Sequence, residues 1–252
     1  MDIKVYPPDQ QGTGAFDGGK ITEQKPIGFP GEGSKVVRIG PLFYWAWAKS
    51  KEAGFIPSHP HQGFEIITYV VNGRAEHGDS LGTKSTVGPG GIQVMQTGSG
   101  VYHQEAFIGP DFDGFQIWFE PYLNEAVLRE PKYSQYNHED FSSNEENNVI
   151  VKKVIGGGSP VQLVADVKMW DIKVEQGSSY SHNLGSDRSL AILAIEGNGI
   201  VDANHNNISF NEKDFVVANS KDSAQVTIQA NSNLRLIMIE VPTHVDYPVY
   251  QK

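Results

Sequence analysis

Histidine and glutamate residues recur at a spacing of two in two short stretches of the chain. The first stretch contains His59 and His61, and the second contains His103 and Glu105. Because side chains alternate between the two faces of a β-strand, each pair places both of its side chains on one face. Imidazole and carboxylate groups bind borderline divalent ions such as Fe²⁺, Ni²⁺, Mn²⁺ and Zn²⁺. Two such pairs on neighbouring strands predict one metal site with positions left open for water, oxygen or substrate.

Two carboxylates compete for the fourth ligand position of this site. Glu65 continues the parity of His59 and His61, whereas Glu105 shares the face of His103, so periodicity alone does not choose between them. The carboxylate that is not a ligand is expected to orient a histidine or to act as a base beside the metal. The other histidines are interpreted as surface residues or as hydrogen-bonded core residues: His77, His138, His182, His205 and His244.

Short β-prone runs separated by turn residues must position these side chains. Residues 65–71 form a strongly β-prone run, and we expect the chain to reverse at the Asn72-Gly73 pair that follows. Further turns are expected at residues 78–82 and 87–91. Turns at this spacing favour an all-β sandwich or barrel over βαβ units.

One predicted strand, residues 42–48, alternates bulky aromatic side chains with small ones. Such a stripe usually packs in the core, and it can also line an apolar slot for a flat aromatic ligand. The candidates for such a substrate pocket are Phe43, Trp45, Trp47, Phe64, Met95 and Phe107.

Composition excludes several classes of function. The 252 residues carry 20 Lys and Arg against 30 Asp and Glu, and this formal net charge of −10 argues against general binding to nucleic acid or to anionic membranes. The absence of cysteine rules out disulfides, thiolate nucleophiles and thiolate metal ligands. No leader peptide or apolar span is evident, so we expect a soluble, cytoplasmic monomer without direct nucleic-acid or membrane contacts.

The second half of the chain faintly repeats the pattern of the first. Residues 122–128 are expected to form a helical turn, after which strand-like runs return. When Gly197 is set against Gly73, positions 59, 61 and 103 correspond to Asn183, Gly185 and Thr227. The second half is therefore expected to keep the scaffold without the metal ligands.

Three motifs resemble successive motifs of the pirin family within the cupin superfamily. They are HPHQGFEIITYVVNG at residues 59–73, EHGDSLG at 76–82 and GSGVYHQE at 98–105, and the resemblance covers most of residues 38–135. It implies a bicupin, two face-to-face antiparallel β-barrels of the jelly-roll type with a short helical linker. The implied domains are a metal-binding cupin at residues 1–130 and a degenerate cupin without a metal site at residues 131–252.

The resemblance also implies a ligand set and a cofactor. His59, His61, His103 and Glu105 would hold one divalent metal ion, with Fe²⁺ expected and Ni, Mn, Zn or Co as alternatives. Glu65 would then orient a ligand, although the broader cupin pattern uses a carboxylate like Glu65 as the ligand itself.

Some members of the family are quercetin 2,3-dioxygenases, so the resemblance favours oxidative ring opening of a flavonol with O₂. Glu105 would act as the proton acceptor. A second hypothesis is a non-enzymatic, iron-dependent regulatory protein that binds a protein partner. A third is a cupin that has become a binding module without metal.

Overall fold

Two compact β units make up the chain. The computed structural model describes residues 1–203 and 206–252, so His205 lies outside the described residues. The N-terminal unit consists of Gln11–Asp140, Leu163–Ala165 and Asp246–Lys252, and the C-terminal unit consists of Met1–Gln10, Phe141–Gln162 and Asp166–Val245. The units are thus interleaved in sequence, and the domain boundary between residues 130 and 131 stays a prediction.

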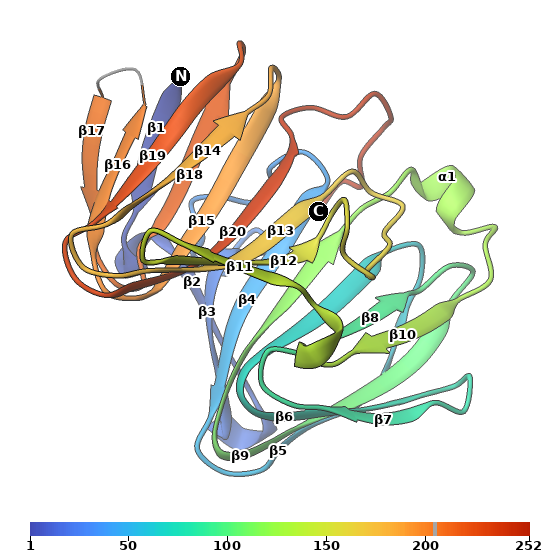
Figure 1. Cartoon of the computed structure of the whole chain (residues 1–252). Coiled ribbons are helices and arrows are strands. Elements are labelled where there is room, and N and C mark those ends of the chain that lie inside the picture. The colour runs from blue at the N-terminus through green and yellow to red at the C-terminus, as the bar shows by residue number, and fades with distance from the viewer. Residues whose placement is uncertain (204–205) are drawn as a thin grey trace. The chain divides into compact units, whose positions relative to one another are not determined.

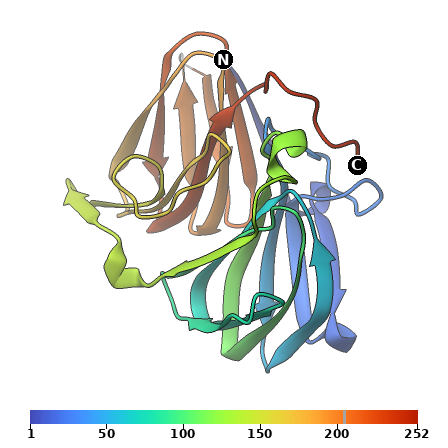
Figure 2. The same cartoon turned by 90° about the vertical axis from the view of Figure 1, so that its right-hand side faces the viewer.

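An antiparallel sheet with the strand order β10-β8-β6-β9-β4-β3-β2 forms the N-terminal unit, with β5 paired to β9 and β7 paired to β6 (Figure 1). The short helix α1 follows β9 and confirms the helical turn predicted at residues 122–128 (Figure 2). The elements are β2 (Gly12–Phe16), η2 (Asp17–Gly19), β3 (Ile21–Ile27), β4 (Leu42–Ser50), β5 (Gly54–His61), β6 (Glu65–Asp79), β7 (Lys84–Val87), β8 (Ile92–Gln96), β9 (Val101–Phe119), α1 (Leu123–Ala126), β10 (Lys132–Tyr136) and η3 (His138–Asp140).

The long strand β6 corrects the predicted reversal at Asn72-Gly73. The strand runs through both residues, and its pairing with β9 shifts register between Val70 and Asn72 and again between Asn72 and Arg74. Gly73 has a φ of 77°, and a Cβ there would lie 2.8 Å from the carbonyl oxygen of Ile108. The Asn-Gly pair therefore marks a β-bulge in a continuing strand. The predicted turns at 78–82 and 87–91 are confirmed, because they connect β6 to β7 and β7 to β8.

A second register shift changes the directions in which the aromatic side chains of β4 point. The pairing of β4 with β9 shifts register between Leu42 and Tyr44, so Phe43 does not follow the simple alternation expected from the sequence. The rings of Phe43 and Tyr44 both contact Trp118, with centroids 6.0 and 4.8 Å away. Trp45 instead contacts Phe115.

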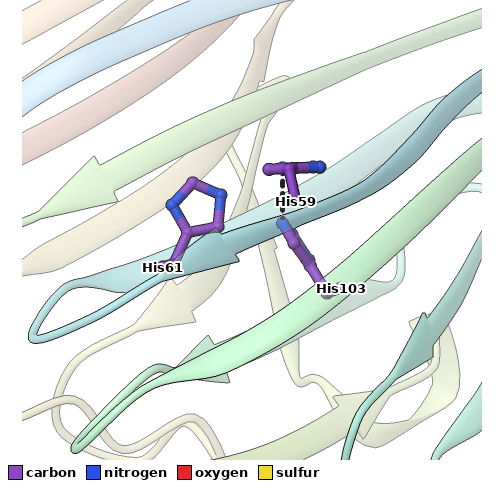
Figure 3. A group of neighbouring side chains, drawn as sticks. All are labelled: His59, His61 and His103. Atoms are coloured by element: carbon purple, nitrogen blue, oxygen red, sulfur yellow. Dashed lines mark hydrogen bonds between the residues drawn. The ribbon is translucent and has the colours of Figure 1, made fainter.

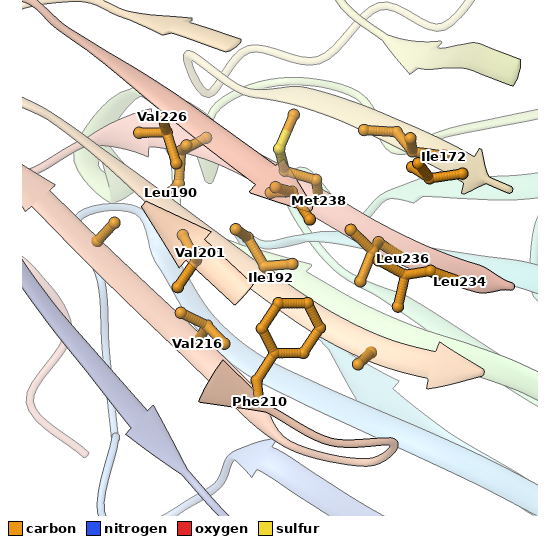
Figure 4. Close-up of a cluster of buried hydrophobic side chains, with 14 of the residues drawn as sticks. Ile172, Leu190, Ile192, Val201, Phe210, Val216, Val226, Leu234, Leu236 and Met238 are labelled. Carbon is orange, nitrogen blue, oxygen red and sulfur yellow. The ribbon is translucent and has the colours of Figure 1, made fainter. Parts of the chain in front are cut away.

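In the C-terminal unit, a sheet with the order β1-β18-β15-β20-β13-β12-β11 and a sheet with the order β14-β19-β16-β17 share one apolar core (Figure 4). Core side chains such as Ile192, Phe210 and Met238 come from both sheets. The elements are β1 (Asp2–Tyr6), η1 (Pro8–Gln10), β11 (Ser143–Glu146), β12 (Val149–Ile155), β13 (Lys168–Val174), β14 (Ser179–Leu184), β15 (Arg188–Glu196), β16 (Gly199–Ala203), β17 (Asn206–Phe210), β18 (Phe215–Ser220), β19 (Ala224–Ala230) and β20 (Leu234–Pro242). Among the described residues, no helix is long and apolar enough to span a membrane.

Candidate metal centre

Antiparallel pairing of β5 with β9 brings the predicted histidines together. His59 lies directly opposite His103, and His61 lies opposite Val101. The pairing shifts register between Ile56 and His59, at the start of the histidine stretch. Figure 3 shows the three imidazole rings turned toward a common space, with His59 and His61 on β5 and His103 on β9.

The ring nitrogens of this cluster fit a divalent metal ion. One ligand nitrogen from each histidine lies within 4.8 Å of the others, and the Nε2 atoms of His59 and His103 are 3.0 Å apart. Two ligands at right angles around an ion, each about 2.1 Å from it, would be separated by roughly 3 Å. The Nδ1 atom of His59 lies 2.8 Å from the carbonyl oxygen of Pro57. That hydrogen bond places the proton on Nδ1 and leaves the lone pair on Nε2 for a metal.

Among the described residues, two buried nitrogens of the cluster have no hydrogen-bond partner. They are Nε2 of His61 and Nδ1 of His103. Buried polar atoms are nearly always satisfied, and the ring of His61 contacts both other imidazoles, so its unpartnered Nε2 is in the position expected of a ligand atom. The donor set and this atom together fit the metal ion that the sequence predicts.

Burial keeps two of the imidazoles neutral. Desolvation, followed by the charges of His103 and His59, lowers the pKa of His61 from 6.5 to about 3. Desolvation, followed by the charges of His59 and His77, likewise lowers the pKa of His103 to about 3. Neutral imidazole is the form that binds metals, so both rings are ready as ligands at neutral pH.

Glu105 lies near the three histidines but is not a member of the cluster. Its side chain is buried, and its charge acts on the pKa of His61. Thr68 Oγ1 donates a hydrogen bond to Oε1 at 3.0 Å, and Gln116 Nε2 donates one to Oε2 at 2.6 Å. Both carboxylate oxygens are therefore held by hydrogen-bond donors, one from the neighbouring strand β6 and one from a later part of β9 itself. The role of Glu105 as a ligand stays a prediction.

His77 packs beside the cluster. Its Nε2 atom lies 2.8 Å from the carboxylate of Asp79, and its ring stacks on Tyr133 with centroids 4.4 Å apart. The ring centroid is 5.5 Å from that of His103. His77 is thus a buried, hydrogen-bonded residue, as predicted, and its ring packs against that of the candidate ligand His103.

Glu65 lies apart from the cluster and has other partners. Its carboxylate accepts hydrogen bonds from the backbone N–H groups of Val164 at 2.7 Å and Ala165 at 2.9 Å, and from Gln96 Nε2 at 2.6 Å. Burial raises its pKa even though these hydrogen bonds oppose the shift. This carboxylate fastens the segment Leu163–Ala165 to the N-terminal unit.

We expect Glu65→Gln to lower stability without weakening metal binding. An amide nitrogen in place of one oxygen would face a backbone N–H, and a lost buried hydrogen bond of this kind costs about 1–3 kcal/mol. Urea unfolding and titration with Ni²⁺ would measure the two effects, with the same substitution at the exposed Glu125 as control. A large loss of Ni²⁺ affinity in Glu65→Gln would instead support Glu65 as the ligand.

An aromatic group adjoins the histidines on one side. The ring of Trp118 contacts His61 edge to face, with centroids 4.9 Å apart, and it also packs against Phe64. Phe43 contacts both Phe64 and Trp118, and Met95 belongs to the same apolar cluster. Of the predicted pocket residues, Phe43, Phe64 and Met95 therefore lie in or against the aromatic group next to the histidines.

The remaining candidates lie in other parts of the N-terminal unit. Trp45 and Trp47 pack against Phe115, and Phe107 stacks on Phe112. All three are buried.

A segment distant in sequence completes the aromatic group. Residues 246–252 belong to the N-terminal unit, where Tyr250 contacts Phe64 with ring centroids 5.6 Å apart. The hydroxyl of Tyr247 donates a hydrogen bond to the carbonyl oxygen of Glu120 at 2.7 Å. The Nζ atom of Lys252 donates to two backbone carbonyls in the loop between β3 and β4, beside which this segment lies in Figure 2.

Sequence reasoning missed Thr68, Gln116 and Trp118. All three lie in strands, and Thr68 pairs directly with Gln116 across β6 and β9. Gln116 carried a usable signal, because a polar side chain inside the apolar run of residues 115–119 needs a buried partner.

Comparisons with known proteins identify the family. The family model described as Pirin matches residues 45–119. A pirin-like protein of Caulobacter vibrioides is 30% identical over 188 residues, which cover 73% of this chain and 76% of the relative. The chain belongs to the pirin family. The chain spans only about half the length of several other relatives, including 48% of Pirin-like protein 2 of Arabidopsis thaliana.

Two further similar proteins carry names that bear on fold and activity. A quercetin 2,3-dioxygenase of Escherichia coli is 25% identical over 189 residues, which cover 73% of this chain and 75% of that protein. The crystal structure of the bacterial pirin YhhW from Escherichia coli in complex with nickel(II) superimposes with a TM-score of 0.78 at 20% identity, covering 97% of this chain and all of that one. The predicted all-β bicupin class is confirmed by this similarity of fold.

Proposed function

We propose that this pirin is a metal-dependent dioxygenase that opens the ring of a flavonol, in the manner of a quercetin 2,3-dioxygenase. The observation that carries the proposal is the cluster of His59, His61 and His103, whose ring nitrogens converge in a chain related to a quercetin 2,3-dioxygenase. In a dioxygenation both atoms of O₂ enter the products, so the flavonol supplies the electrons and no external reductant is needed.

The chain's own residues divide the tasks. His59, His61 and His103 would hold the metal with Glu105, and iron or nickel both suit such ligands. When bound, the ion acts as a Lewis acid toward the 3-hydroxyl of the flavonol and toward oxygen. Glu105, which shares a strand face with His103, would accept the hydroxyl proton.

The aromatic group beside His61 would orient the substrate. The ring of Trp118 contacts His61, the ring of Phe64 stacks on Trp118, and flat aromatic molecules pack well on such rings. Their apolar surfaces would also exclude water from the reacting carbon atoms.

Oxygen uptake tests the proposal directly. We expect protein loaded with Fe²⁺ or Ni²⁺, mixed with quercetin without air and then exposed to oxygen, to consume one O₂ for each flavonol lost. A flavone without the 3-hydroxyl should give no uptake, because it has no proton for Glu105 to accept. An oxygen electrode and the flavonol absorbance measure the two quantities.

Metal-loaded protein that takes up no oxygen with any flavonol in a small panel would contradict the proposal. That result would favour the alternative role, in which the metal site regulates binding of a protein partner.

A further inference from the structure

A chain of hydrogen bonds links the aromatic group to Glu105. The indole Nε1 of Trp118 donates to Oε1 of Gln116 at 3.1 Å, and Nε2 of the same amide donates to Oε2 of Glu105 at 2.6 Å. Gln116 is 9% exposed and Glu105 is 3% exposed, so solvent has little access to either group.

The indole fixes which way the Gln116 amide points. An indole N–H can only donate, so it requires an acceptor and selects the amide oxygen. The amide NH₂ group is thereby turned toward Glu105, where it meets an acceptor. Without the indole N–H, the amide could turn its oxygen toward the carboxylate, and two acceptors would then face each other.

Trp118 also touches a second member of the site. Its ring contacts His61, so a single side chain packs against one candidate ligand and orients, through Gln116, the hydrogen bond to another. Thr68 Oγ1 donates a hydrogen bond to the other carboxylate oxygen of Glu105 at 3.0 Å, so both oxygens are held in place.

We infer that Gln116 and Trp118 are positioning residues that set the orientation of Glu105 for the metal. The inference rests on the proposed function only in taking Glu105 as a metal-directed carboxylate. Outer partners of this kind typically change metal affinity about 10- to 100-fold.

A double-mutant cycle with Co²⁺ as the probe tests this inference. Trp118→Phe keeps an aromatic ring beside His61 but removes the N–H, and Gln116→Leu removes the amide at similar volume. We expect each to weaken Co²⁺ binding about 10-fold and to shift the visible absorption of bound Co²⁺. In the Glu105→Gln background, either change should alter the affinity less than twofold, because the group through which they act has been replaced.

Circular dichroism of each variant establishes that it folds, and Trp118→Phe provides the test if Gln116→Leu does not fold. Equal losses of Co²⁺ affinity in both backgrounds would overturn the inference, because the residues would then act through His61 or through general packing. If the variants weakened Co²⁺ binding only when Glu105 is present, but the protein oxidised no flavonol, the proposed activity would be overturned and the inference would stand.

Discussion

His103→Ala is expected to weaken Ni²⁺ binding by more than about 100-fold, which exceeds the loss typical of a residue that only orients a ligand. His103 is 2% exposed, and its Nε2 atom lies 3.0 Å from that of His59. Alanine removes one of the three converging nitrogens, and it leaves His59 and His61 as a weaker pair. Isothermal titration of the apoprotein with Ni²⁺ gives the affinity, and competition with a chelator extends the range.

The matched control for this substitution is His244→Ala. His244 is an exposed histidine of the C-terminal unit, so its loss removes an imidazole without touching the cluster. Both variants should retain the circular dichroism of the parent. If His103→Ala bound Ni²⁺ as tightly as His244→Ala, the cluster would not be the metal site.

The local part of the site was predictable because it depends on strand parity. Spacing of two placed His59 and His61 on one face and led to the expectation that a second strand would bring His103 alongside, and the pairing of β5 with β9 does so. The elements failed to follow the sequence pattern where bulges intervene. Phe43 departs from the alternation of its strand, and Asn72-Gly73 bends a strand that the sequence predicts to end.

The rest of the site depends on contacts between residues far apart in sequence. Glu65 has the right parity for a ligand, but the backbone of Val164 and Ala165 occupies its carboxylate from about 100 residues away. Likewise, Glu105 accepts a hydrogen bond from Thr68 of β6, 37 residues away, and one from Gln116 further along its own strand β9. Periodicity describes faces of single strands, and it carries no information about which distant group reaches those faces.

A buried charged cluster in the C-terminal unit gives the second large effect. Glu240, which is 2% exposed, accepts hydrogen bonds from Arg188 Nε at 2.8 Å and Lys168 Nζ at 2.9 Å, and its other oxygen lies 2.8 Å from His182 Nε2. Burial raises the pKa of Glu240, but the hydrogen bonds from His182 and Lys168 and the charges of Lys168 and Arg188 outweigh it. The net result lowers the pKa from 4.5 to about 2.

We expect Glu240→Gln to lower the free energy of unfolding by about 3 kcal/mol at pH 7, because Arg188 and His182, whose side chains are largely buried, lose the buried carboxylate that pairs with them. The folded-state pKa lies below the unfolded value of 4.5, so the carboxylate stabilises the fold fully above pH 4.5. This contribution is lost as the pH falls toward about 2, where the carboxyl group is protonated in both states. The difference between parent and variant should therefore shrink over that range.

Urea unfolding at a series of pH values measures this difference, and Glu196→Gln, at an exposed position of the same unit, is the control. Glu196→Gln should change stability by less than about 0.5 kcal/mol at every pH, as is usual for surface substitutions. A deficit in Glu240→Gln that stayed constant from pH 7 to pH 2 would mean that packing, and not the ionised carboxylate, stabilises this part of the fold. A deficit that closes on acidification would establish Glu240 as the charge around which Lys168, Arg188 and His182 are organised.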